Sequence, residues 1–156
     1  ASQWRAHPVW MSHVLADSDR TIWLNAQNGP LFFSRDVTVH VAWHATVSFM
    51  WLQLLYTAGY RRVLMAGFDN SYTQAASARE GDVIDQGAEA DANHFDPGYF
   101  QGKRWQAADT SHMEATYMLA RKIYEEDGRT LLNCTHGGAL EVLPRQPLEE
   151  ALQHRM

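Results

Sequence analysis

One apolar run that ends on a glycine and an aspartate constrains this chain most. Residues 62–66 read Arg-Val-Leu-Met-Ala and lead into Gly67-Phe68-Asp69. Such a run is typical of a strand buried in a parallel sheet, and open α/β sheets hold their ligands at the carboxyl ends of their strands. A second run, residues 129–135, ends on polar groups before Gly137-Gly138. We expect both strands to deliver polar groups to one crevice.

Helical patterns flank the first of these strands. Residues 45–58 predict a helix that Gly59 would cap, and Ser111-His112-Met113-Glu114 has the spacing of a capping box before a second helix that Gly128 would end. The expected buried stripes are Val47, Met50, Trp51, Leu54, Leu55 and Ala58 in the first helix, and Met113, Thr116, Tyr117, Ala120, Ile123 and Tyr124 in the second. Strand, helix and strand in this order predict parallel strands joined by a right-handed crossover. The expected fold class is therefore α/β, with a Rossmann-like, mostly parallel sheet and flanking helices.

The remaining segments carry weaker patterns. Residues 67–110 predict a long polar loop with a functional role, and residues 147–154 predict a short final helix. Residues 21–24 are compatible with a further strand, whereas residues 1–31 are otherwise poorly defined. At 156 residues, we expect the whole chain, residues 1–156, to form one domain.

Composition excludes several classes of function. The net charge of −5 and the lack of a long basic run argue against nucleic acid as a partner. Cys134 is the only cysteine, so no disulfide can form within the chain, which fits a reducing compartment. We find neither an apolar stretch long enough for a membrane span nor a signal-peptide pattern, and we expect a cytoplasmic protein.

A series of short motifs resembles a known group of enzymes. The motifs are His44-Ala45-Thr46-Val47-Ser48-Phe49, residues 58–69, Tyr72, Asp91-Ala92-Asn93-His94-Phe95, Tyr99 and residues 133–142. In this order they resemble the single-domain bacterial sialyltransferases and a related family that includes archaeal pterin pyrophosphokinases and flagellin-glycosylating motility accessory factors. The similarity extends over about residues 32–150.

The resemblance implies a glycosyltransferase that moves a sugar from a nucleotide sugar to a hydroxyl acceptor in cell-surface glycan synthesis. Such a reaction needs a base, a way to stabilise the departing phosphate, and polar contacts to ribose and base. His94 is the candidate base, or else a loop histidine bonded to a neighbouring aspartate. Tyr72 would donate to the phosphate, or only pack its ring. Asp69 would accept from a sugar hydroxyl, or only cap the following turn.

Further residues in these motifs are candidates for substrate binding. They are Thr46, Asn70, Asn93, Tyr99, Asn133, Thr135, Gly137 and Gly138. Glycines after a strand let backbone amides approach a ligand, although they also form ordinary turns. The expected partners are a nucleotide sugar and a glycan acceptor, with no cofactor and no metal.

The chain departs from its relatives at one motif. They open with a strand and a Gly-Asn-Gly-Pro-Ser-Leu turn near the nucleotide, whereas Asn28-Gly29-Pro30-Leu31 is only faintly similar, with no strand expected before it. The chain therefore resembles the C-terminal portion of a larger enzyme or a shortened relative. We expect that it does not act alone as a complete transferase, and that a homodimer covers an exposed sheet edge.

Two other functions remain open. One is a magnesium-dependent transfer of diphosphate to a pterin-like alcohol, in which the acidic residues Asp82, Asp85, Glu89 and Asp91 would hold the metal with its phosphates. The other is a non-catalytic fragment or assembly module. His40 and His44 are four residues apart, but the expected helix begins near His44, which argues against a shared metal.

Overall fold

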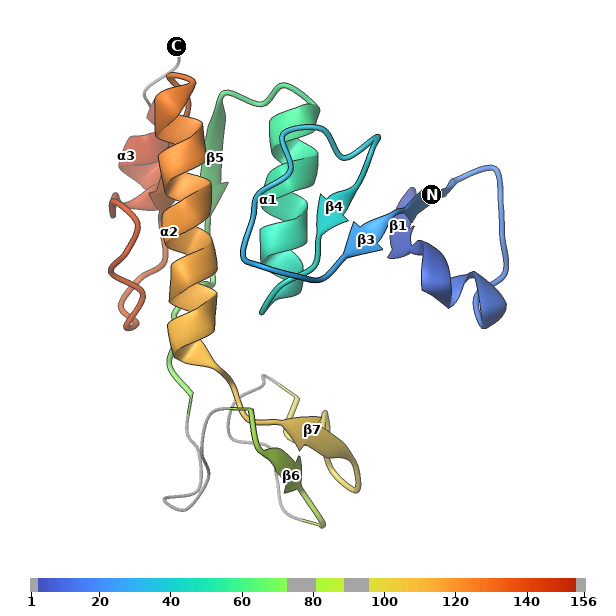
Figure 1. Cartoon of the computed structure of the whole chain (residues 1–156). Helices are drawn as coiled ribbons and strands as arrows, with labels where there is room; N and C mark the ends of the chain where they lie inside the picture. The colour runs from blue at the N-terminus through green and yellow to red at the C-terminus, as the bar shows by residue number, and fades with distance from the viewer. Residues whose placement is uncertain (1–2, 73–80, 89–95, 154–156) are drawn as a thin grey trace. The chain divides into compact units, whose positions relative to one another are not determined.

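A computed structural model describes residues 3–72, 81–88 and 96–153 of the chain (Figure 1). The fold is mixed α/β, and the described residues form three α-helices and four two-stranded sheets. Two compact units divide the chain, residues 1–63 with 115–131 and residues 64–114 with 132–156. No helix in the described part of the chain is long and apolar enough to cross a membrane.

The N-terminal segment of the first unit holds two small parallel sheets. Strand β1 (Arg5–Pro8) pairs with β2 (Thr21–Leu24), and β3 (Ala26–Gln27) pairs with β4 (Val41–Ala42). A 3-10 helix, η1 (Val9–His13), follows β1. The strand expected at residues 21–24 is confirmed, whereas β1 lacks an apolar run and β3 has only two residues. Because β3 leads directly into Asn28, the expectation that no strand precedes this turn was wrong.

Helix α1 (Val47–Thr57) is confirmed, but it buries a different face from the one expected. Thr46 caps its N-terminus, and Gly59 follows it with a φ of 86°. The buried side chains are Phe49, Met50, Leu52, Gln53 and Tyr56, whereas Val47 and Trp51 are about half exposed. The buried face includes Gln53 because the amide of this side chain forms hydrogen bonds with the backbone of Ser34 and Ala42 at 2.9–3.0 Å. A buried amide with all partners satisfied is stable in the core, and an apolar stripe does not reveal it.

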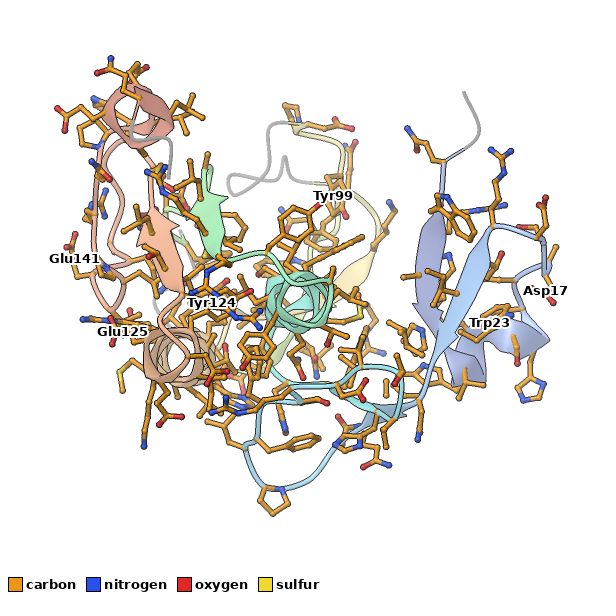
Figure 2. All side chains as sticks on the ribbon, turned by 90° about the horizontal axis from the view of Figure 1, so that it is seen from above. Asp17, Trp23, Tyr99, Tyr124, Glu125 and Glu141 are labelled. Atoms are coloured by element: carbon orange, nitrogen blue, oxygen red, sulfur yellow. The ribbon has the colours of Figure 1, made fainter. Side chains whose placement is uncertain are left out.

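Helix α2 (Thr110–Glu126) packs on α1 within the first unit. The hydroxyl of Tyr124 donates to the carbonyl of Leu52 at 2.8 Å, and Figure 2 shows Tyr124 between the two helices. Thr116, Tyr117, Ala120 and Tyr124 are buried, as the expected stripe requires. The capping box at Ser111 was wrong, because the N–H of His112 donates to Oδ1 of Asp109 at 2.8 Å. Asp109 is therefore the N-cap, and the helix begins at Thr110, two residues earlier than an N-cap at Ser111 would place it.

Strands β5 (Arg62–Met65) and β8 (Thr130–Asn133) are neighbours, on either side of α2 in the sequence. The N–H of Thr130 donates to Arg61 at 2.8 Å, and the N–H of Cys134 donates to Met65 at 2.7 Å. Because the partners on both strands advance in the same direction, the strands are parallel. The expected strand–helix–strand arrangement is confirmed, and it places the ends of β5 and β8 at one edge.

The segment expected to be one long loop contains a hairpin. Strands β6 (Val83–Asp85) and β7 (Arg104–Gln106) pair antiparallel, and Phe100 stacks on Trp105 with ring centroids 5.2 Å apart. Three-residue strands are below the length at which alternation is visible, so the sequence pattern missed them. The residues Asn93 and His94 lie outside the described part of the chain. The final helix, α3 (Leu148–Gln153), is confirmed with slightly shorter bounds.

Candidate functional site

Gly138 joins the ends of β5 and β8 within the second unit. A Cβ at this position would lie 2.5 Å from Cα and 2.6 Å from the carbonyl oxygen of Asp69. The N–H groups of Ala139 and Leu140 donate to that same oxygen at 2.6 and 3.2 Å. Gly138 has a φ of 83°, which favours glycine, so both sterics and backbone conformation require it here. The structure therefore brings Asp69 and Gly138 together, as the strand pattern implied.

Asp69 is exposed, and only one oxygen of its carboxylate has a partner among the described residues. Oδ1 accepts from the N–H of Ser71 at 3.1 Å, which is the turn cap considered as the alternative role for Asp69. Oδ2 accepts no hydrogen bond from the part of the chain that the structure describes. The side chain therefore caps its turn and still presents an acceptor to solvent.

Thr135 and Asn133 hold the turn after β8. The hydroxyl of Thr135 accepts from the N–H of Phe68 at 2.8 Å, which ties this turn to the end of β5. Asn133 is fully buried, and its amide bonds the carbonyl of Leu140 at 3.0 Å and the N–H of Thr135 at 3.0 Å. Both polar atoms of Asn133 are thus occupied by backbone. Its geometry is that of a loop scaffold, whereas the Thr135 hydroxyl keeps a proton that can be donated.

Asn70 adds a second acceptor next to Asp69. Its φ is 54°, a left-handed conformation that asparagine tolerates better than most residues. Nδ2 donates to Glu114 at 3.2 Å, whereas Oδ1 is buried and accepts no hydrogen bond from the described residues. A buried acceptor without a donor costs free energy, so this oxygen is suited to a water or ligand hydroxyl.

Sequence reasoning missed Arg145, which clamps the turn after β8. Its guanidinium donates to the carbonyl oxygens of Thr135 at 2.9 Å and Leu140 at 3.2 Å, and also to that of Gly137. Glu141, labelled in Figure 2, pairs with the same guanidinium at 3.1 Å. No periodic or motif signal marks an arginine that binds backbone carbonyls five to ten residues away. The convergence of these carbonyls on one cation fixes the turn that carries Gly138.

A pocket of about 430 Å³ opens beside the same turn. It is lined by Asn133, Cys134, Thr135, His136, Arg145, Gln146, Pro147, Leu148 and Glu149. Its volume is within the range of small-molecule sites. The predicted residues Asn133 and Thr135 contribute to it, and so does His136.

The two predicted tyrosines of the second unit are exposed. Tyr72 is 38% exposed and Tyr99 is 46% exposed. Lys103 lies over the Tyr99 ring, with its Nζ 5.7 Å from the centroid. Tyr99 belongs to the aromatic cluster next to the β6–β7 hairpin, where it contacts Phe100 edge to face. Its ring therefore packs against Phe100 and Lys103, and substrate binding by Tyr99 remains a prediction.

Thr46 belongs to the first unit, where it caps a helix. Its hydroxyl accepts from the N–H of Ser48, and the two hydroxyls lie 2.8 Å apart. Ser48 in turn bonds the hydroxyl of Tyr117 at 2.8 Å, and burial raises the pKa of Tyr117. Substrate binding by Thr46 remains a prediction, whereas its capping role is observed.

The described residues offer no ready-made metal centre. No group of three or more His, Cys, Asp or Glu side chains within residues 3–72, 81–88 and 96–153 is arranged to hold an ion. His40 and His44 instead contact the ring of Phe32, with centroids 5.4 and 5.7 Å away. Both histidines thus belong to an aromatic cluster.

Comparison with protein-family models, curated proteins and solved structures found no match for this chain.

Proposed function

We propose that this chain carries the donor-binding edge of a Rossmann-like glycosyltransferase, which moves a sugar from a nucleotide sugar to a hydroxyl acceptor. The observation that carries the proposal is the contact of Gly138 with the backbone of Asp69. This contact brings the carboxyl ends of two neighbouring parallel strands together in one surface. Such strand ends are where α/β folds bind nucleotides. The order of the family-like motifs along the chain supports the same function.

The polar groups at the two strand ends, an exposed oxygen of Asp69 and a buried oxygen of Asn70, suit a sugar nucleotide. Oδ2 of Asp69 and Oδ1 of Asn70 would accept from hydroxyl groups of ribose or of the transferred sugar. The Thr135 hydroxyl would donate to a phosphate oxygen. Gly137 has a positive φ and a Cβ at this position would meet open space, so a phosphate can approach the main chain there.

The transfer itself requires a base and a leaving-group donor. In the proposed step, an acceptor oxygen forms a bond to the anomeric carbon while the bond from that carbon to the phosphate oxygen breaks. The proton of the acceptor passes to His94, since an imidazole side chain can serve as a general base. The phenols of Tyr72 and Tyr99 would donate to the departing phosphate.

Calorimetry with cytidine, uridine and adenosine nucleotides, with and without magnesium, tests the proposal. We expect cytidine or uridine monophosphate to bind without metal, and Asp69→Asn to weaken that binding about tenfold, since a charge-assisted hydrogen bond is worth about 1.5–3 kcal/mol. Asp19→Asn is the matched control, because it removes the same charge from an exposed residue of the first unit.

Other results point elsewhere. Binding of ATP only with magnesium would favour the diphosphate transferase. No binding of any nucleotide would favour a non-catalytic module.

A further inference from the structure

The pocket beside the turn after β8 lies at a different edge of that strand from β5. Alternate residues of a strand direct their N–H and C=O groups to opposite edges. The N–H of Cys134 bonds Met65 of β5, whereas the N–H and C=O of Asn133 bond Pro144 and Gln146 at 2.9 and 3.1 Å. The pocket lies on the Asn133 side, and no residue of 66–70 lines it. The pocket is therefore separate from the end of β5, where Asp69 and Asn70 lie.

Arg145 gives one wall of this pocket a positive charge. Its side chain is only 27% exposed, and most of its hydrogen bonds go to neutral carbonyl oxygens, which leave its formal charge in place. The only carboxylate paired with it among the described residues, Glu141, is 69% exposed and so is screened by water. Nε donates to no acceptor in the described residues. The guanidinium thus retains both charge and a donor for a further anion.

The rest of the lining is a mixture of apolar and polar groups. The pocket has apolar surface from Cys134, Pro147 and Leu148. His136 adds an imidazole ring to the lining. Glu149 is the one carboxylate among the lining residues, and it is exposed. A ligand that fits this lining has an anionic head for Arg145 and an apolar body for Leu148 and Pro147.

We infer that this pocket binds a small organic anion, a carboxylate or a phosphate attached to an apolar or aromatic body. The pocket differs from the proposed donor surface in that Asp69 and Asn70 do not line it, and Thr135 is the residue that the two share. A ligand in the pocket would still contact the turn that carries Gly138, since Arg145 and Thr135 belong both to the pocket wall and to that turn.

Three probes with the same ring and different heads test the inference on the full chain. Benzoate, phenyl phosphate and benzylamine are titrated while the amide resonances of residues 133–149 are followed by NMR. We expect benzoate and phenyl phosphate to shift these resonances in a saturable way. Benzylamine should bind at least about tenfold more weakly, because its positive charge is repelled by the positive charge of Arg145. Equal binding of all three, or no saturable shift with any, would overturn the inference.

Two variants separate loss of the pocket from loss of the fold. Arg145→Gln removes the cation and should weaken both anions about tenfold or more, but it also removes the clamp on the turn. Leu148→Trp fills the pocket from its apolar side and should abolish anion binding while the clamp remains. Leu152→Trp is the matched control, because Leu152 is 62% exposed on the same helix and does not line the pocket.

The outcomes distinguish this site from the donor surface. Leu148→Trp should leave nucleotide binding in place, whereas Asp69→Asn should leave benzoate binding in place. Unchanged anion binding in Leu148→Trp, with the protein still folded, would show that the anion binds elsewhere and would refute the inference.

Discussion

Three residues around one turn have different physical roles, although all lie at the end of the same strand or after it. Asn133 is buried and satisfies backbone groups, Arg145 draws carbonyl oxygens together, and Gly138 provides the close approach to Asp69. The glycine pair was expected to let backbone amides approach a ligand or to form an ordinary turn, and the contact of Gly138 with Asp69 was not predicted. Asn133 was expected to contact substrate, but both polar atoms of its amide form hydrogen bonds with the backbone of the protein itself.

Gly138→Ala should destabilise the protein more than Gly137→Ala. Both glycines have positive φ, so both substitutions incur backbone strain of about 1–2 kcal/mol. A Cβ at Gly137 meets open space, whereas a Cβ at Gly138 lies within 2.7 Å of three Asp69 atoms. Overpacking adds about 1–3 kcal/mol for Gly138→Ala alone. Urea unfolding measures the difference, and equal losses in the two variants would contradict the geometry.

Tyr124 should make stability fall at high pH. Burial raises its pKa to about 12, above the ordinary value of 10.0 that applies to the unfolded chain. The folded state therefore holds its proton more tightly, and the stabilising effect is complete below pH 10 and is lost as pH rises toward 12. Tyr124→Phe should cost about 1 kcal/mol near neutral pH through the lost bond to Leu52.

The test compares the two proteins across that pH window. The unfolding free energy of the wild type should drop more steeply between pH 10 and pH 12 than that of Tyr124→Phe. Parallel curves would show that another group is responsible for the loss.

At the scale of elements, segments with a helical period or an apolar run were predictable, and strands without either were not. The helices α1, α2 and α3 and the pairing of β5 with β8 follow from apolar spacing and from the crossover rule. Strands β3, β6 and β7 have only two or three residues, and β1 reads Arg-Ala-His-Pro, which is not an apolar run. The buried face of α1 was misjudged because Gln53, a polar residue, occupies its centre.

The true cap of α2 gives a direct test at this scale. Asp109→Ala should cost about 1 kcal/mol, since Oδ1 of Asp109 is the acceptor for the N–H of His112. Ser111→Ala should cost less than about 0.5 kcal/mol, because the helix has already begun at Thr110. Thermal or urea unfolding separates the two. A larger loss for Ser111→Ala would restore the capping box inferred from the sequence.

At the scale of the whole molecule, the four sheets are small, and a Rossmann-like sheet is part of the proposal rather than an observation. Strands in a two-stranded sheet each keep one edge without a strand partner, and such edges tend to pair with another chain. We therefore expect self-association to a dimer, measured by sedimentation over a range of concentrations. A monomer at every concentration would contradict this expectation.

The surface proposed to bind the donor could be anticipated only in part. Asp69, Thr135 and Gly138 were located by strand ends, which sequence periodicity reveals. The role of Arg145 depends on backbone carbonyls that converge only after folding, and so does the pocket at the other edge of β8. No spacing in the sequence predicts either of them. The roles of His94 and Asn93 remain predictions, because both lie outside the described residues.

One titration tests the central claim, that the ends of β5 and β8 form a single nucleotide site. Cytidine or uridine monophosphate is added to the full chain while the amide resonances of residues 66–71 and 135–140 are followed by NMR. The account predicts that both segments shift together with one dissociation constant, and that Asp69→Asn weakens both by about tenfold. Shifts confined to one segment, or the absence of saturable shifts in either, would contradict it.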